Sequence, residues 1–157
     1  MTETRWLDDE EQRAWRAYLR MQARLAAALN RQLQATSKLS LADYGVLVQL
    51  TEAPQGRLRP YELQRALDWE QSRLSHQLRR MQQRGLVTRE ACPEDARGAY
   101  VVVTETGRRA IAAAAPGHVQ AVRELVFDAL EPGQVAVLRR LATQVLDRIE
   151  AVTNGNA

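Results

Sequence analysis

Apolar residues recur every three or four positions along most of the chain, the spacing typical of amphipathic helices. The pattern predicts helices over Asp9 to about Gln34, Leu41 to about Glu52, Pro60 to about Ala66, Gln71 to about Gly85, Glu105 towards Leu130, and Pro132 to about Val152. The segments LVTREA and AYVVVT are rich in Val, Thr and Tyr, and the intervening CPEDARG contains Pro and Gly, so a two-stranded hairpin is expected there. The pair Pro116 and Gly117 should kink or split the fifth helix. The predicted fold class is mainly α with a small β wing.

Two of these helices begin with the signature of a capping box. Asp8 is followed three residues later by Glu11, and Ser40 is followed by Asp43. In each pair the first side chain can accept from the backbone of the second residue, and the second can accept from the backbone of the first. Glu70 occupies the corresponding position before the fourth helix, where Glu is not a favoured residue, so a weak cap is expected there.

The fourth helix, QSRLSHQLRRMQQRG, has two contrasting sides. At about 100° per residue, Leu74, Leu78 and Met81 share one stripe. The other side carries polar residues, namely Ser72, His76, Arg79 and Gln83, bordered by Arg73, Ser75 and Arg80. Residues 71–89 contain five Arg and no Asp or Glu. Such a helix can enter the major groove of DNA, where these donors reach base edges and phosphates. The alternative is a solvated basic face above a core stripe.

The neighbouring segments favour the DNA-binding interpretation. A short helix, a tight turn and a second, basic helix form a helix-turn-helix. Gly85 is expected to end the basic helix in a left-handed conformation, with Leu86 closing back onto Met81. Asp95 and Arg97 lie at the tip of the hairpin, where the carboxylate can hold the guanidinium stem and the cation can enter a narrow minor groove. An ordinary exposed turn pair is the alternative.

The two ends of the chain carry apolar surface in excess of what a small lobe can cover. The last helix has an a/d seam, formed by Val135, Leu138, Ala142, Val145, Ile149 and Val152. The first helix contributes Trp15 and Leu19. We therefore expect an N-terminal dimerisation helix in residues 1–36, a winged helix-turn-helix lobe in 37–107 and C-terminal dimerisation helices in 108–157. Packing of the end helices within one chain is the alternative, and both can hold. A homodimer predicts a pseudo-palindromic DNA site.

Composition narrows the possibilities only slightly. The chain has 157 residues, 45% of them hydrophobic, a net charge of +3 and a pI of about 9.5. Of its 22 basic residues all but Lys38 are Arg, which suits bidentate phosphate and guanine contacts but can equally reflect codon composition. The sequence lacks both a long apolar run and a signal-peptide pattern, so a soluble cytoplasmic protein without membrane partners is expected. The lone Cys92 cannot form an intrachain disulfide.

An enzyme has little support in this sequence. The chain holds one Cys and two His, and nothing identifies a nucleophile with its base. It has no phosphate-binding glycine loop, and its His and Cys are too few for a zinc cluster. No cofactor and no metal site are therefore expected. A winged-helix module that binds protein instead of DNA is the remaining rival, and it would lack the steep salt dependence of DNA binding.

The order of these elements resembles the MarR family of bacterial winged-helix transcriptional regulators over nearly the whole chain. The resemblance rests on four segments, LSLADYGVLVQL, RPYELQRALDW, SRLSHQLRRMQQRGLV and EDARGAYVVVTETGRR. In that family an Asp-x-Arg wing, here Asp95 and Arg97, is followed by a strand and a Thr-x-x-Gly, here residues 104–107. Relatives commonly have Gly, Trp and Ser before the recognition helix, whereas this chain has Asp68, Trp69 and Glu70. Asp tolerates the left-handed backbone that Gly would supply.

The resemblance implies a homodimer whose terminal helices intertwine. It places Arg97 in the minor groove and the following residues towards the major groove: Ser72, Arg73, Ser75, His76 and Arg79. Family habit also implies repression, relieved by a small anionic or aromatic ligand in a cleft between the dimer helices and the DNA-binding lobe. The candidate lining residues are Trp15, Tyr18, Tyr44 and His118, with plain core packing as the alternative. Some members sense oxidants through a Cys near the start of the first helix, whereas Cys92 lies at the wing.

Overall fold

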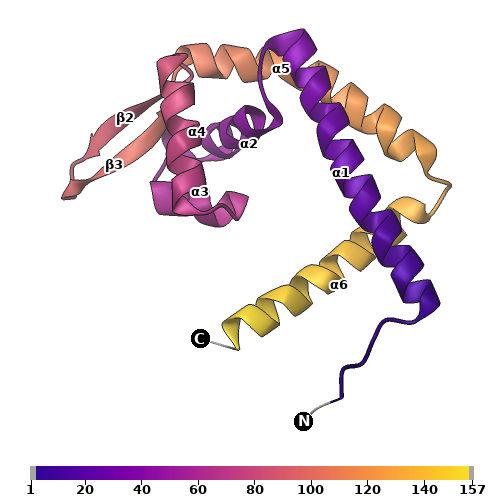
Figure 1. Cartoon of the computed structure of the whole chain (residues 1–157). Coiled ribbons are helices and arrows are strands. Elements are labelled where there is room, and N and C mark those ends of the chain that lie inside the picture. Colours follow the sequence, from indigo (N-terminus) through magenta and orange to yellow (C-terminus); the bar gives the residue numbers. More distant parts are fainter. Residues whose placement is uncertain (1–2, 156–157) are drawn as a thin grey trace. The chain divides into compact units, whose positions relative to one another are not determined.

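A computed structural model of the chain describes residues 3–155, except for the side chain of Ala96. In chain order the elements are α1 (Asp9–Ser37), α2 (Leu41–Glu52), η1 (Pro54–Gly56), β1 (Arg57–Leu58), α3 (Pro60–Leu67), α4 (Gln71–Gln83), β2 (Val87–Cys92), β3 (Asp95–Val103), α5 (Glu105–Leu125), η2 (Phe127–Ala129) and α6 (Gln134–Asn154). The chain forms two compact units, of which the first ends at Val119 and the second begins at Gln120, within α5. Figure 1 shows the ribbon with these labels.

The mainly helical fold with a small wing is confirmed, with two differences in detail. The wing sheet has three strands instead of two, because β1, only two residues long, pairs with β3. A strand of that length is too short to show a periodic pattern. Of the two outcomes predicted at Pro116 and Gly117, a kink or a split of the helix, the split does not occur, since α5 continues through Pro116 and ends at Leu125. One proline removes one helical hydrogen bond, and the preceding Ala-rich run has a high helix propensity.

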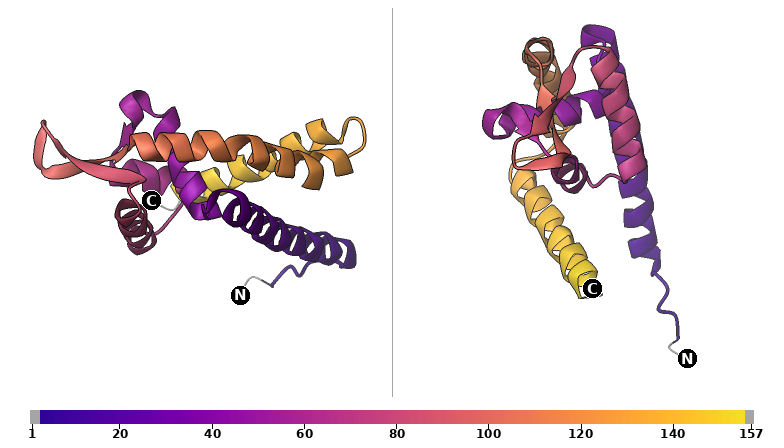
Figure 2. Two further views of the ribbon diagram at one scale, coloured as in Figure 1. Left: turned by 90° about the horizontal axis from the view of Figure 1, so that it is seen from above. Right: turned by 90° about the vertical axis from the view of Figure 1, so that its left-hand side faces the viewer.

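The strand order is β1-β3-β2, and both pairings are antiparallel. Val87 pairs with Val103, and the register shifts between Ala91 and Cys92 near the tip. The hairpin of β2 and β3 extends away from α3 and α4 in Figure 1 and in the left view of Figure 2. The wing therefore has its base in the core and its tip in solvent.

The core of the first unit joins helices α1 to α5 with strands β2 and β3, and Leu58 of β1 packs against it. It is built from Leu33, Leu39, Val46, Leu47, Leu50, Leu63, Leu74, Leu78, Met81, Leu86, Val87, Val101, Val103 and Ala114. The predicted stripe of α4 is confirmed, because Leu74, Leu78 and Met81 are all buried. In α1, only Leu29 and Leu33 near the C-terminal end are buried. The rest of that helix leaves its apolar side uncovered.

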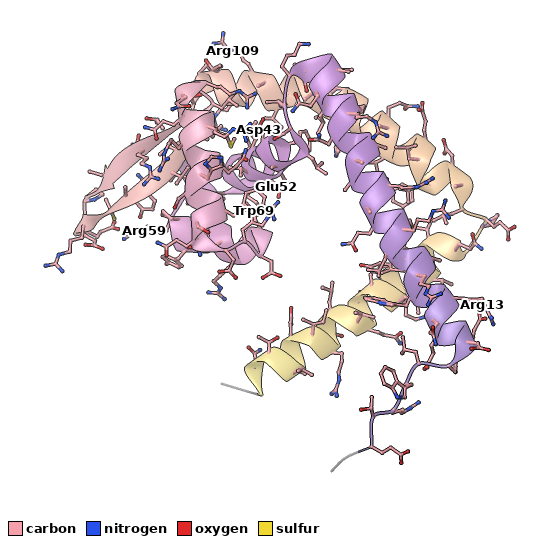
Figure 3. The ribbon with its side chains drawn as sticks, viewed as in Figure 1. Arg13, Asp43, Glu52, Arg59, Trp69 and Arg109 are labelled. Carbon is pink, nitrogen blue, oxygen red and sulfur yellow. The ribbon has the colours of Figure 1, made fainter. Side chains whose placement is uncertain are left out.

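Both predicted capping boxes are present, and that of α2 extends into a buried network. Asp43 Oδ2 accepts from the Ser40 backbone N–H at 2.8 Å and from Arg84 Nη1 at 2.6 Å. Its Oδ1 accepts from Gln77 Nε2 at 2.6 Å. Arg84 also donates to the Lys38 carbonyl at 2.6 Å. Asp43, labelled in Figure 3, therefore ties the start of α2 to the buried side and the end of α4.

The C-terminal end of α4 is closed as predicted. Gly85 has a φ of 73°, and Leu86 N–H donates to the Met81 carbonyl at 3.0 Å, which is a Schellman contact. Thr104 then donates to the Gly85 carbonyl at 2.6 Å and accepts from Gly107 N–H at 3.0 Å, so one hydroxyl joins the end of α4 to the start of α5. A Cβ at Gly107 would collide with the Leu86 carbonyl, which explains the spacing of the Thr-x-x-Gly motif.

The second unit consists of the end of α5, the 3-10 turn η2 and α6. Every residue of α6 is exposed, including the predicted seam. Leu141 and Leu146 are also exposed, at 54% and 57%, so the apolar side of α6 is wider than a strict a/d stripe. No helix within residues 3–155 is long and apolar enough to cross a membrane.

Replacing Asp43 with Ala should lower the free energy of unfolding by about 2 to 3 kcal/mol, because a buried Gln and a partly exposed Arg both lose a charged acceptor. The matched control is Asp8→Ala, which removes the exposed capping box of α1 and should cost about 1 kcal/mol or less. Urea denaturation followed by circular dichroism measures both. Equal losses in the two variants would show that the buried network adds nothing beyond a helix cap.

Candidate nucleic-acid interface

The predicted DNA-contacting side of α4 is exposed, opposite the buried stripe. We call it the basic face of α4 and define it as Ser72, Arg73, Ser75, His76, Arg79 and Arg80, all of which are exposed. The predicted division of α4 into a buried and an exposed side is therefore confirmed, while the roles of these residues in DNA binding stay a prediction. Gln77 lies on the buried side, where it donates to Asp43. The hydrophobic pattern did not predict this burial, because Gln77 is polar.

The arginines of α4 fall into two groups. Arg84 is bound to Asp43 and to the Lys38 carbonyl, so its donors are used within the protein. Within residues 3–155, Arg79 and Arg80 make no ion pair and no side-chain hydrogen bond. The guanidinium donors of these two residues are therefore available to an external acceptor such as a phosphate or a guanine edge.

The entry into α4 is shaped by Asp68, Trp69 and Glu70, of which Asp68 and Glu70 depart from the pattern of the resembling family. Asp68 adopts a left-handed conformation with a φ of 53°, as expected from its place where relatives have Gly. Glu70 makes no side-chain cap, which confirms the weak cap. Trp69 provides a platform instead, because the Arg73 guanidinium stacks 4.2 Å from its ring centroid. Arg73 is thus held against the start of its own helix.

At the wing tip the structure differs from the expected contact. The Asp95 carboxylate does not hold the guanidinium of Arg97: its Oδ1 accepts from the Arg97 backbone N–H at 3.0 Å, and its Oδ2 lies 3.8 Å from Nη1 of Arg59. Asp95 therefore supports the wing through the backbone of the turn. Arg97 itself is exposed.

A cluster on the outer side of the wing sheet was not predicted. The guanidinium of Arg57 lies 4.3 Å and that of Arg59 5.2 Å from the centroid of the Tyr100 ring. Arg57 also pairs with Glu90 at 3.6 Å. The alternating Arg-Leu-Arg of residues 57–59 is a weak strand signal, but its partners lie more than thirty positions away in the chain.

The four aromatic candidates for a ligand pocket form two separate pairs. Tyr44 and His118 contact each other with ring centroids 4.3 Å apart, while Trp15 and Tyr18 stack at 5.7 Å on the exposed part of α1. Leu29, the first buried residue of α1, lies about 21 Å along the helix from Trp15 at 1.5 Å per residue. One chain therefore does not bring the four residues into one pocket. A hollow of about 430 Å³ lies elsewhere, lined by Ala26, Asn30, Leu41, Ala42, Trp69 and Arg73.

Burial affects both members of the Tyr44 and His118 pair. Desolvation raises the pKa of Tyr44 and lowers the pKa of His118 below its usual 6.5. His118 Nδ1 is buried and has no hydrogen-bond partner among the described residues. A proton there would be unsatisfied, so the neutral ring is favoured.

Cys92 lies at the end of β2 and is buried, with Sγ 3.5 Å from Glu94 Oε2. A buried sulfur is little exposed to oxidants in solution. The position of Cys92 therefore gives no support to a thiol switch.

Because His118 resists protonation in the folded state, stability should fall as the pH is lowered through about 6.5, where the unfolded chain begins to bind the proton. Stability from this residue is fully present above that pH. We expect His118→Phe to lose less stability than the parent between about pH 7.5 and pH 5.5 in urea denaturation. The control is His76→Gln on the exposed face of α4, which should retain the parental difference. A parental pH dependence in His118→Phe would contradict this assignment.

The chain is similar to several known proteins. A family model described as MarR family matches residues 37–98. Sco3205, a MarR family transcriptional regulator from Streptomyces coelicolor solved in complex with DNA, is 42% identical, with a TM-score of 0.88 over 92% of this chain and 91% of that one. AbsC, a MarR family regulator from the same organism, is 38% identical, with a TM-score of 0.88 over 94% of this chain and 99% of that one. No curated protein matches the chain.

A more distant structure has the same fold. A mutant MarR from E. coli complexed with operator DNA is 25% identical, with a TM-score of 0.76 over 90% of this chain and 99% of that one. The match to the S. coelicolor proteins extends over both units, well beyond the segment that the family model covers. The chain therefore belongs to the MarR family of transcriptional regulators, which are regulators and not enzymes.

Proposed function

We propose that the protein binds double-stranded DNA of defined sequence as a homodimer and represses transcription from a pseudo-palindromic operator. The observation that carries this proposal is the basic face of α4, which is exposed while its opposite side is locked into the core. Two similar proteins, Sco3205 and the E. coli MarR mutant, are described in complex with DNA. A DNA-bound regulator acts where the chromosome lies, so we place it in the cytoplasm.

The chemistry of the basic face of α4 suits the major groove. Arg79 and Arg80 can bind guanine edges or phosphates in a bidentate manner, while Ser72, Ser75 and His76 offer shorter donors. Arg97 at the exposed wing tip is suited to a narrow minor groove, whose negative potential attracts a guanidinium. These two contacts would read the same half-site from adjacent grooves.

A second copy is the occupant that best suits the apolar side of α6. The seam residues Val135, Val145 and Ile149 are 51%, 59% and 55% exposed, and Trp15 and Leu19 of α1 are 52% and 43% exposed. Exposed apolar patches of this kind mark interfaces. A twofold dimer would place two copies of α4 about one helical turn apart on DNA.

We further propose that a small anionic or aromatic ligand releases the protein from DNA. The hollow near Trp69 and Arg73 supports this, because a cation and an aromatic ring line it together and Arg73 also belongs to the basic face of α4. A ligand there would compete with DNA for the same guanidinium.

Selection of binding sites from random duplexes, followed by titration at low and moderate salt, tests the proposed function. A regulator should enrich a sequence with inverted symmetry and lose about a thousandfold in affinity between about 50 and 200 mM salt, as expected for several phosphate contacts. Repeating the titration with aromatic acids tests ligand release. Failure to enrich any duplex, with a flat salt response, would favour a protein-binding module.

Replacing Arg79 with Ala should weaken binding to the selected duplex by about 1 to 3 kcal/mol, and binding to random duplex by less, if the guanidinium reads a guanine edge. The control is Arg13→Ala, because Arg13 pairs with Glu10 on α1 and should not contact the operator. Fluorescence anisotropy measures both variants. An equal loss on both duplexes would show that Arg79 contacts only phosphate.

Replacing Val145 or Ile149 with Asp should split the dimer, since a carboxylate would be buried in an apolar seam. Gln144→Asp adds the same charge on the other side of α6, about 130° from the centre of the seam at 100° per residue, and should leave assembly unchanged. Sedimentation velocity reports the mass of each variant. A dimer that persists in both seam variants would move the interface away from α6.

A further inference from the structure

Arg59 links the wing to the helix-turn-helix. It occupies the position between β1 and α3, where its backbone N–H donates to Glu62 Oε2 at 2.7 Å as part of the start of α3. Its guanidinium lies above Tyr100 and 3.8 Å from Asp95 Oδ2. The side chain is only 22% exposed. The backbone of Arg59 therefore begins α3, while its guanidinium is fixed on the wing. Arg59 is labelled in Figure 3.

The wing has a space that suits this guanidinium. A Cβ at Gly98 would collide with Arg59 Nη1 and would lie 3.2 Å from Asp95 Oδ2. The backbone of Gly98 is not in the left-handed region, so the conformation does not explain this glycine. The lack of a side chain explains it, because it lets the guanidinium of Arg59 lie against the strand at Gly98.

Asp95 joins this anchor to the tip. One carboxylate oxygen faces Arg59, and the other accepts from the Arg97 backbone N–H at 3.0 Å. An isolated two-stranded hairpin is marginally stable in water, so a free wing would sample many positions of its tip. Fixing Asp95 from outside the hairpin restricts the backbone from which the Arg97 side chain extends.

We infer that Arg59 is a positioning residue for the minor-groove arginine: through Asp95 and the space left by Gly98, it pre-orders the turn that carries Arg97. This inference rests on the proposed DNA binding. Pre-ordering lowers the entropy lost when a mobile segment binds, so the contribution of Arg59 to affinity should pass through Arg97.

The chain offers a matched control in Arg57. Like Arg59, it places a guanidinium over Tyr100, but it pairs with Glu90 of β2 and not with Asp95. Arg57→Gln removes the same charge from the same aromatic ring and leaves the turn untouched. Gly98→Ala changes no charge at all, yet it displaces the guanidinium of Arg59.

The test is a double-mutant cycle measured by anisotropy on the selected duplex. Arg59→Gln and Gly98→Ala should each weaken binding by roughly three- to tenfold in the parent, the range for contacting residues, and by less than about twofold in an Arg97→Ala background. Arg59→Lys should retain part of the affinity, whereas Arg57→Gln should have the same effect in both backgrounds. An undiminished loss in the Arg97→Ala background, or parental binding by Gly98→Ala, would overturn the inference.

A measurement without DNA separates this inference from the proposed function. Amide relaxation in the free protein should show a lower order parameter at Arg97 in Arg59→Gln and Gly98→Ala, and an unchanged one in Arg57→Gln. Unchanged order in all three variants would reject the positioning role even where the parent binds DNA. If the order falls but the parent prefers no duplex, the proposed function fails and the structural link remains.

Discussion

The carboxylate of Asp43 is the constraint on which the placement of α4 depends. It completes the capping box of α2 and accepts from two residues of α4, Gln77 and Arg84. The Asp43 carboxylate is buried, and a buried charge is tolerated only when its hydrogen bonds are satisfied. Because the partners come from the buried side and the end of α4, the helix cannot rotate about its axis or slide without breaking a charged hydrogen bond. Its exposed side is thereby fixed in direction.

The helix is held at its end more firmly than at its start. Glu70 provides no side-chain cap, and the left-handed Asp68 and the stack of Arg73 on Trp69 shape the entry instead. At the other end, the Schellman contact at Gly85 and the hydroxyl of Thr104 join α4 to α5. The N-terminal turn of a recognition helix is the part that approaches base edges in helix-turn-helix proteins. Its anchorage here is an aromatic stack, not a hydrogen-bonded cap.

Local chemistry predicted most of the fold. The capping boxes at Asp8 and Ser40, the left-handed Gly85 and the stripe of α4 depend on residues within one or two helical turns, and all are present. The predictions from sequence missed the features that depend on partners distant in the chain. β1 exists because it pairs with β3 some forty-five positions later, and Gln77 is buried because Asp43 lies opposite. The split considered at Pro116 does not occur, because the residues around it keep α5 helical. For the candidate site, the side was predictable from the helix wheel, but the wing contact of Asp95 was not.

The arginines show why composition alone could not define the site. Three arginines bind groups of the protein itself and so stiffen the scaffold: Arg57, Arg59 and Arg84 contact carboxylates, a carbonyl or an aromatic ring. Arg79 and Arg80 make no such bonds within the described residues, so they can bind an external anion. In the sequence both kinds look alike, since residues 71–89 carry Arg79 and Arg84 without any acid between them. The fold distinguishes the two kinds of arginine. It places Asp43 beside Arg84 at the end of α4 and leaves the side with Arg79 and Arg80 exposed to solvent. A guanidinium is free to recognise DNA only where the fold supplies no acceptor for it.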